Sequence, residues 1–310
     1  MPLDVIALGE PLFEFNRRAG DEGVWLEGGL WLEGWGGDTS NAAIAAARQG
    51  AKVGYLTALG DDIFGRSFHD LWSREGVDAS RVKIDPGAPT GVYFVTHGAH
   101  CHEFTYRRAG SAASRYAAAD VPADYLAGAK FLHVSGISQA VMGSAVNQAV
   151  AHARAAGVAV SYDTNLRLKL WPLERARAEI HAAVAQSQVV FTSLDDAEGL
   201  TCRTDPVLIA DFYLGLGPRL VVVKLGADGV TVAMQGRRET IAGHRVNTVD
   251  ATGAGDSFAG AFLAELAAGR DAFTAAEYAN AAAALKTTGY GAVAPIPRRH
   301  TVEQFLSTRR

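Results

Sequence analysis

Cysteine, blocks of like charge and long apolar runs are all scarce in this sequence, and each shortage excludes a class of protein. The 310 residues include two cysteines, Cys101 and Cys202, too few and too distant for the disulfide framework of a small secreted domain. A formal net charge of −4 without a basic stripe argues against nucleic acid and anionic membranes as partners. No stretch of about 18 apolar residues occurs, so we expect no membrane span. The start, MPLDVIALGE, has no basic segment before an apolar run, so we expect no signal peptide and a cytoplasmic protein.

What the sequence does have is a regular alternation of short apolar runs and helical patterns. The runs that read as buried strands are 5–8, 53–58, 130–134, 158–162, 189–192 and 220–224. Helical periodicity lies between them at 39–49, 64–74, 144–156 and 173–185. This alternation predicts a single α/β domain over 1–310, in which helices cover both faces of a mostly parallel sheet. Such sheets bind their ligands outside the carboxyl ends of the strands.

Two segments interrupt this alternation, at about 12–36 and about 90–108. The first is rich in aromatic residues (VWLEGGLWLEGW), and the second reads as a hairpin of VYFVTH and HEFTYR. Strands that merely extend the main sheet would also fit these patterns. Because a full βαβ unit separates the two aromatic segments, we instead expect antiparallel strands that pair into a small sheet, a lid over a cleft. Trp25, Trp31 and Trp35 would give so thin a sheet an apolar face, which predicts a homo-oligomer formed through the lid.

The most informative stretch is 247–263, which reads NTVDATGAGDSFAGAFL. Gly253 and Gly255 precede a helical pattern, and glycines let a backbone turn sharply and approach a ligand closely. The N-terminus of a helix presents free amides and a partial positive charge, which suits an anion. Asp256 would lie in the first turn, where it could accept a hydroxyl proton while the amides stabilise a moving phosphoryl group. The plainer alternative is a tight turn followed by an ordinary acidic helix start.

The run DATGAGD at 250–256 resembles the C-terminal signature of the PfkB, or ribokinase-like, carbohydrate kinases. GGDTSN at 36–41 and LGDDIFG at 59–65 fit the same family, so the resemblance covers essentially the whole chain. It implies a ribokinase-like fold with a β-sheet lid over a sugar, ATP as the phosphoryl donor, and Mg²⁺. It also implies an anion hole formed by Gly253, Ala254 and Gly255, beside Asp256 as the catalytic base.

The same resemblance assigns residues to the nucleotide and to the metal. Those assigned to ATP are Ser193, Lys224, Gly226, Gly229, Gly253, Gly255 and Asn280. Related kinases carry an Asn-x-x-Glu motif that assists Mg²⁺ and phosphate, whereas the aligned residues here read Ser193-Leu-Asp-Asp196. The metal ligand is therefore unassigned, with Asp196, acting through a water molecule, as its candidate.

At the sugar end, FTYRRAGSAAS (104–114) and DTNLRLKLW (163–171) resemble the 2-keto-3-deoxygluconate kinases of this family. The residues that the resemblance assigns to the substrate are Gly37, Asp38, Asn41, Tyr93, Tyr106, Arg108, Arg167 and Asp256. A physical argument agrees, because a neutral sugar needs no guanidinium, whereas a sugar acid's carboxylate pairs well with arginine's planar fork. The implied activity is phosphorylation of 2-keto-3-deoxygluconate at its terminal hydroxyl, giving the 6-phosphate.

Structural explanations compete for these residues. Arg108 could be a solvated residue on a hairpin arm, the tyrosines could pack the lid strands, and Arg167 could cap a helix. Rival functions are kinases of the same fold for 2-keto-3-deoxygalactonate, fructose or ribose, and a non-catalytic sugar-binding regulator. The intact Gly-Ala-Gly before Asp256 argues against the regulator, because a pure binder has no need of that acid.

Overall fold

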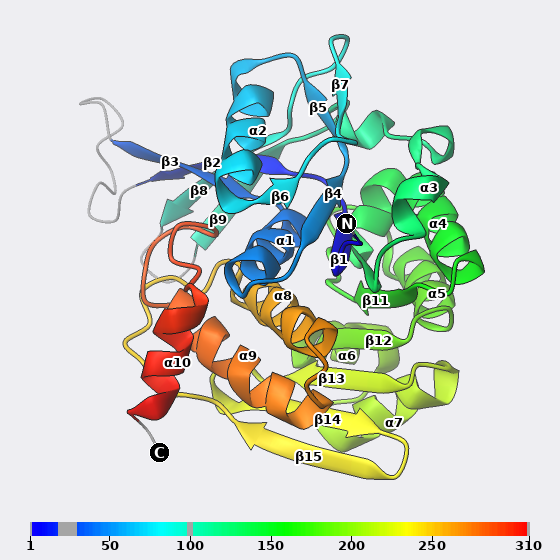
Figure 1. Cartoon of the computed structure of the whole chain (residues 1–310), viewed down its shortest axis with the longest axis vertical. Coiled ribbons are helices and arrows are strands. Elements are labelled where there is room, and N and C mark those ends of the chain that lie inside the picture. The colour runs from blue at the N-terminus through cyan, green and yellow to red at the C-terminus, as the bar shows by residue number, and fades with distance from the viewer. Residues whose placement is uncertain (1, 18–29, 98–101, 309–310) are drawn as a thin grey trace.

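The computed structural model describes residues 2–17, 30–97 and 102–308, and its main feature is a nine-stranded sheet (Figure 1). The strands in sheet order are β15 (Arg237–Ala242), β14 (Gly229–Met234), β13 (Leu220–Lys224), β12 (Val189–Ser193), β11 (Ala159–Asp163), β10 (Phe131–Ser135), β1 (Val5–Leu8), β4 (Val53–Leu56) and β6 (Val77–Asp78). Every neighbouring pair from β6 to β13 is parallel, whereas β13, β14 and β15 pair antiparallel. The α/β architecture predicted from the sequence is therefore confirmed.

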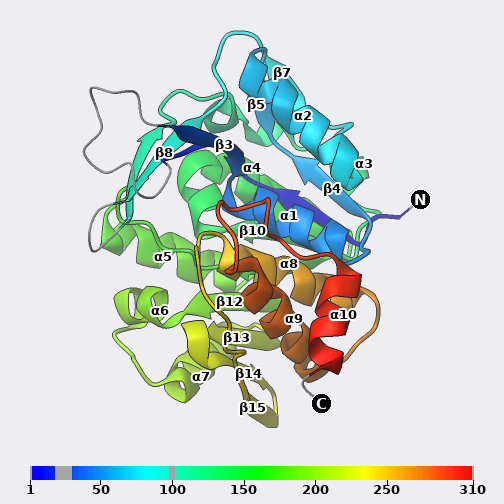
Figure 2. The ribbon, with the colours of Figure 1, turned by 90° about the vertical axis from the view of Figure 1, so that its left-hand side faces the viewer.

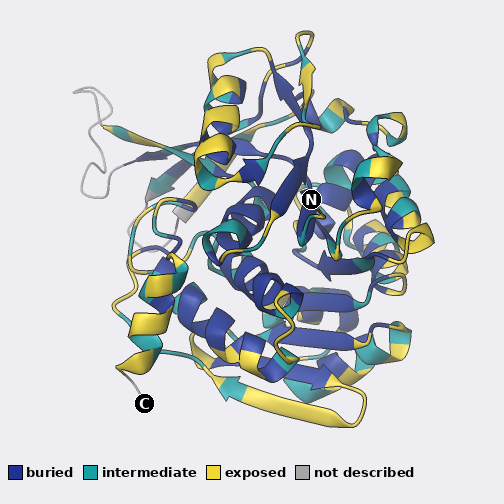
Figure 3. Cartoon of the chain, in the orientation of Figure 1, coloured by how far each residue is buried: buried dark blue, intermediate teal, exposed yellow. Residues whose placement is uncertain are grey.

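Helices cover both faces of this sheet (Figure 2). On one face lie α1 (Asp38–Arg48), α2 (Ile63–Glu75), α8 (Ala254–Ala267), α9 (Ala272–Lys286) and α10 (Arg299–Ser307); on the other lie α3 (Ala123–Leu126), α4 (Gly136–Ala155), α5 (Leu173–Val184), α6 (Leu194–Thr201) and α7 (Pro206–Leu216). Within β1, Val5 packs in the first core and Ile6 in the second, because successive residues of a strand point to opposite faces. This two-sided burial, the dark blue centre of Figure 3, explains why the strands are continuous apolar runs.

Four strands form a second, smaller sheet (Figure 1). In sheet order they are β3 (Trp31–Gly36), β2 (Leu12–Arg17), β8 (Val92–His97) and β9 (His102–Arg107). The separate small sheet is thus as predicted, but the expectation that its strands are all antiparallel is wrong, because β2 and β8 run parallel. Both strands leave the α/β core at one place, where Phe13 N–H donates to Gly91 O (2.9 Å), and they continue side by side in the same direction.

The tryptophans of the small sheet have partners within the chain. Trp35 Nε1 donates to Ser67 Oγ of α2 (3.3 Å), which ties the sheet to that helix. Trp31 lies edge-on to Phe94 of β8, with ring centroids 5.6 Å apart. Trp25 lies outside the described residues. Association through the lid therefore stays a prediction.

The remaining elements of the described chain are short. They are the paired strands β5 (Ala58–Gly60) and β7 (Lys83–Asp85) and the 3₁₀ turns η1 (Ala113–Arg115), η2 (Ala118–Asp120) and η3 (Gly226–Asp228). Within the described ranges, no helix combines the length and the apolar character needed to cross a membrane.

Candidate active site

A cavity of about 1150 Å³ opens at the carboxyl ends of the parallel strands, between the small sheet and the start of α8. Every site residue predicted from the sequence lines it: Gly37, Asp38, Asn41, Tyr93, Tyr106, Arg108, Arg167, Ser193, Asp196, Lys224, Gly226, Gly229, Gly253, Ala254, Gly255, Asp256 and Asn280. The structure thus brings the predicted sugar, phosphate and nucleotide ends into one continuous space. A concave site with a few convergent polar groups is the usual form of a small-molecule pocket.

The glycine-rich turn leads directly into α8. Gly253 is the N-cap, in the left-handed region (φ 76°), and the helix begins at Ala254. The sequence had suggested that Gly255 precedes the helix, whereas in the structure it lies inside the first turn. The Ala254 amide donates to Ala251 O (3.1 Å), which leaves it less free for an anion than predicted. The next amides, those of Gly255 and Asp256, belong to the first helical turn, where amides have no acceptor one turn back.

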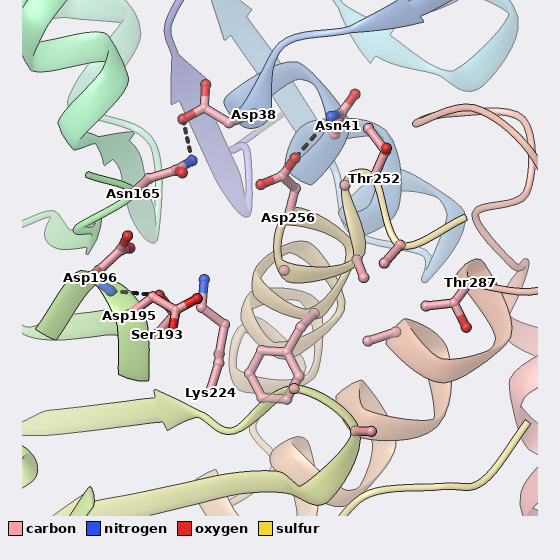
Figure 4. Close-up of a pocket in the computed structure, with 18 of the residues that line it drawn as sticks. Asp38, Asn41, Asn165, Ser193, Asp195, Asp196, Lys224, Thr252, Asp256 and Thr287 are labelled. Carbon is pink, nitrogen blue, oxygen red and sulfur yellow. Dashed lines mark hydrogen bonds between the residues drawn. The ribbon is translucent and has the colours of Figure 1, made fainter. Parts of the chain in front are cut away.

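Asp256 projects from this first turn into the cavity (Figure 4). Asn41 Nδ2 donates to its Oδ2 over 2.8 Å and holds the carboxyl group in place. Desolvation, followed by the carboxylates of Asp38 and Asp163, raises the pKa of Asp256 to about 7. Lys224 and the hydrogen bond from Asn41 act in the opposite direction without cancelling this rise. A carboxyl group with such a pKa can accept and release a proton near neutral pH, as a general base must.

Asp38, the first residue of α1, also lines the cavity (Figure 4). Asn165 Nδ2 donates to Asp38 Oδ2 (3.0 Å), while the buried Oδ1 has no hydrogen-bond partner among the described residues. A carboxylate held in this way can accept hydrogen bonds from sugar hydroxyls. Sequence reasoning missed Asn165 as a site residue. Its position in the DTNLR run was a signal, but its partner is 127 residues away and nothing local indicates the contact.

Lys224, at the end of β13, brings a positive charge to the start of α8. Its Nζ donates to Asp163 Oδ2 (2.6 Å) at the end of β11. A Cβ built on Gly255 would lie 3.2 Å from this Nζ, so the ammonium group lies beside the first turn of the helix. Desolvation lowers the pKa of Lys224, but attraction to Asp163 outweighs it, and the net shift is upward. The lysine is therefore a fixed cation, and Asp163 is a second residue that sequence reasoning missed.

Ser193 and Asp196 lie at the start of α6. Ser193 Oγ accepts a hydrogen bond from Asp196 N–H (3.1 Å) and so caps the helix. Thr164 Oγ1 donates to Asp196 Oδ2 (3.0 Å), and Arg167 Nη1 lies 3.9 Å from Oδ1. Desolvation, with the carboxylate of Asp163 adding to it, raises the pKa of Asp196.

No cluster of three His, Cys, Asp or Glu side chains suited to a metal occurs in residues 2–17, 30–97 and 102–308. Mg²⁺ at nucleotide sites keeps several waters and takes one or two carboxylates together with phosphate oxygens, so it needs no such cluster. Asp196 lines the cavity, and its carboxylate fits this modest requirement, whereas Asp163 is paired with Lys224.

Arg108 follows β9 and forms an ion pair with Glu10, which lies just beyond β1. Ser111 Oγ also donates to Glu10 Oε1 (2.7 Å). Burial raises the pKa of Glu10, which is 1% exposed, and the guanidinium of Arg108 lowers it. The Arg108 guanidinium also lies over the ring of Tyr106, 5.6 Å from its centroid, so it is not a solvated hairpin residue. Sequence reasoning missed Glu10, although an acid just past a buried strand is a usable signal.

The two predicted tyrosines take different roles in the structure. The Tyr93 hydroxyl donates to Glu14 of β2, so this group is already used within the small sheet. The rings of Tyr93 and Tyr106 stack with centroids 5.9 Å apart, and both line the cavity.

At the far end of the cavity, Asn280 joins α9 to the edge of the main sheet. Its Nδ2 lies 3.3 Å from both Ile241 O and Ala242 O of β15 and donates to them. Gly226, the first residue of the short turn η3, and Gly229, which follows the turn, line the cavity as well. The side chain of Asn280 thus shapes this wall by holding the strand end.

Known proteins match nearly the whole length of this chain. The model of the pfkB family of carbohydrate kinases matches residues 3–299. The 2-dehydro-3-deoxygluconokinase of Thermoproteus tenax is 36% identical over 309 residues, which cover 98% of this chain and 94% of that protein. Probable fructokinase-7 of Arabidopsis thaliana is 33% identical over 323 residues, 99% of this chain and 93% of that protein. A crystal structure of a protein assigned as ribokinase II from E. coli, in complex with ATP and Mg²⁺, has a TM-score of 0.92 at 27% identity, with 99% of each chain covered.

Proposed function

Because this chain belongs to the pfkB family of carbohydrate kinases, we propose that it transfers a phosphoryl group from ATP to the terminal hydroxyl of 2-keto-3-deoxygluconate (2-dehydro-3-deoxy-D-gluconate), giving the 6-phosphate. The observation that carries the proposal is the pair of guanidinium groups, Arg108 and Arg167, in the same cavity as Asp256. The substrate is thus a sugar acid, held by its carboxylate at one end and phosphorylated at the other.

The choice of a sugar acid rests on charge. The relatives are named for a sugar acid and for a neutral sugar at similar identity, so identity alone does not choose between them. Glu10 balances the charge of Arg108 and fixes its position. Arg167 is half exposed; its Nη1 donates to Leu166 O (2.8 Å) and lies 3.9 Å from Asp196 Oδ1, which leaves several of its five donors for a ligand. A neutral sugar would have no use for this second cation.

In this mechanism Asp256 accepts the proton of the sugar hydroxyl as its oxygen attacks the phosphoryl group. The amides of Gly255 and Asp256 and the ammonium of Lys224 stabilise the negative charge on the transferring group. Asp38 orients the sugar through its hydroxyls, and the small sheet limits the access of water. Asp196 would hold Mg²⁺, which would supply neutralisation of part of the phosphate charge.

A coupled assay of ADP release from Mg-ATP tests the proposal against a panel of five compounds: 2-keto-3-deoxygluconate, its galacto epimer, fructose, ribose and gluconate. We expect turnover with the keto-deoxy acids and little with the neutral sugars. Turnover with fructose or ribose alone would support the kinase activity and the role of Asp256 as base, but it would contradict the role of the two arginines in substrate recognition. Sugar-dependent turnover of any kind would exclude the binding-only regulator.

Replacing Arg167 with alanine should raise KM for the sugar acid far more than KM for ATP. The reason is that the lost guanidinium contacts the sugar carboxylate and not the nucleotide, and a charge-assisted hydrogen bond contributes roughly 1.5–3 kcal/mol, about a tenfold to 10²-fold change in KM. Steady-state kinetics with each substrate varied in turn provide the measurement. Lys169→Ala, two residues along the same loop and outside the cavity lining, is the matched control. An unchanged KM for the sugar acid in Arg167→Ala would remove this residue from the substrate site.

The pH dependence follows from the pKa of about 7 for Asp256. The base works only when it is ionised, so kcat/KM should be constant at alkaline pH and fall about tenfold per pH unit below that midpoint. If the carboxylate had an ordinary pKa, this fall in kcat/KM would occur about three pH units lower. Kinetics in a series of buffers of equal ionic strength would locate the midpoint. A profile that stays flat down to about pH 5 would contradict the raised pKa.

A further inference from the structure

A lysine that the mechanism does not use lies beneath the phosphate end of the cavity. Lys286, the last residue of α9, is 0% exposed. Lysines are almost never fully buried unless they are paired, because burial of an ammonium group is costly. In the described part of the chain no carboxylate forms an ion pair with Lys286, and its Nζ donates to the backbone carbonyl of Asp250 (2.9 Å). A lysine at the end of a helix usually caps its own helix, whereas this ammonium group reaches another element.

The carbonyl that Lys286 contacts belongs to the turn that leads into α8. The side chain of Asp250 ties that turn at both sides, since its Oδ1 accepts from Thr252 N–H (2.8 Å) and its Oδ2 from Gly291 N–H (2.9 Å). The amide of Asp250 donates to Thr287 O (3.1 Å), directly after Lys286. Together these bonds fix the backbone that presents Gly253 as the N-cap of α8.

The charges around Lys286 come from three elements. Asp250 lies in the turn, Glu14 on β2 of the small sheet, and Asp256 on α8. Desolvation lowers the pKa of Lys286, and the attraction to these three carboxylates offsets this lowering only in part. Asp256 also faces Asp38 of α1.

A second cation near Asp256 is Lys224 of β13, which pairs with Asp163 of β11. Two lysines therefore lie near the start of α8: the partly exposed Lys224 on the cavity side, and the buried Lys286, which contacts the turn before the helix. Only Lys224 lines the cavity.

We propose that Lys286 is a positioning residue for phosphoryl transfer, an internal cation that holds the turn 250–253 so that the first-turn amides of α8 meet the transferring group. The inference rests on the proposed kinase activity. It extends that proposal, because Lys286 would support the anion hole without touching either substrate. Its positive charge, beneath the turn, also favours the extra negative charge that the site carries in the transition state.

Lys286→Met tests this role, because methionine is unbranched, similar in length and uncharged. We expect kcat to fall between about tenfold and about 10²-fold, less than for loss of a direct oxyanion donor. KM for the sugar acid should change little, since Lys286 does not line the cavity. In Lys286→Ala, added ammonium ion should restore part of kcat and tetramethylammonium should not, a rescue that a merely structural defect would not give.

Lys130→Met is the matched control for stability. Lys130 Nζ also donates to a backbone carbonyl, that of Ala267 (2.7 Å) at the other end of α8. If Lys286→Met loses activity only through a weakened fold, Lys130→Met with a similar fall in Tm should lose as much. Unchanged kcat in folded Lys286→Met would overturn the proposal. If that variant does not fold, Lys286→Gln, which keeps a donor without the charge, and the ammonium rescue of Lys286→Ala decide the question; absence of rescue overturns it.

Failure of the proposed substrate would be distinguishable from failure of this inference. The wild-type panel assay identifies the sugar first, and Lys286→Met is then measured with whichever sugar is turned over. If no sugar is turned over, calorimetry with ATP and with ADP, both without sugar, carries the test. Lys286→Met should weaken the binding of ATP several-fold more than the binding of ADP, because only ATP brings a third phosphate toward α8. Equal weakening of both nucleotides would overturn the proposal.

Discussion

Asp256→Asn is expected to lower kcat by about 10²–10⁴-fold, the usual effect of removing a general base. The asparagine keeps the shape of the side chain and an oxygen that can accept the hydrogen bond from Asn41, so the geometry of the site should survive. Binding of the sugar acid should therefore remain close to that of the wild type. The coupled assay measures the first effect, and calorimetric titration with the sugar measures the second. Near-normal turnover would remove Asp256 from its role.

Two controls separate chemistry from folding in this variant. Asp195→Asn removes an exposed acid that also lines the cavity, and it should leave kcat within a few-fold. The second control is thermal unfolding of Asp256→Asn at about pH 8. The pKa of Asp256 is about 7 in the folded protein against an ordinary 3.8, so the folded state binds the proton more tightly and stability falls as pH rises through this interval. Above it the ionised carboxylate destabilises the fold, and Asp256→Asn should therefore be at least as stable as the wild type.

Lys224→Met should lower kcat by about 10²–10³-fold, the range seen when one group that stabilises a transition-state anion is removed. The ammonium group lies beside the first turn of α8, where the transferring phosphoryl group gains its charge, and methionine fills a similar volume without that charge. The affinity for ATP should fall less than kcat, because the contact strengthens in the transition state. Single-turnover and steady-state kinetics with Mg-ATP separate these two effects.

The partner of Lys224 complicates this variant and also supplies its control. Lys224→Met leaves Asp163 buried without its cation, and an uncompensated buried charge is strongly destabilising. Adding Asp163→Asn should restore thermal stability, since the pair is then removed together. If kcat stays low in the stable double variant, the loss belongs to the missing cation. Recovery of kcat together with Tm would show that Lys224 acts only on the fold.

The fold was predictable to the extent that its signals are local. Strands such as β1 and β13 are continuous apolar runs because helices cover both faces of the main sheet. Consecutive apolar residues in the sequence therefore indicate that these strands are buried. The parallel pairing of β2 with β8 was not predictable in this way. It depends on where the two strands leave the core, and Phe13 and Gly91 meet there only after folding.

The features of the site also fall into those with a local sequence signal and those that depend on folding. By itself, the sequence determined the glycine-rich helix start, the position of Asp256 in its first turn, and the presence of one arginine after the small-sheet hairpin and another after a strand of the main sheet, because each is a property of a few neighbouring residues. Only the tertiary structure decided which polar and charged groups meet: Asn165 with Asp38, Glu10 with Arg108, Asp163 with Lys224, and Lys286 with the turn before α8. The physical reason is that a hydrogen bond or ion pair depends on distances of a few ångströms in space. Asn41 and Asp256 lie 215 residues apart along the chain and 2.8 Å apart in the folded protein, and no local pattern encodes that proximity.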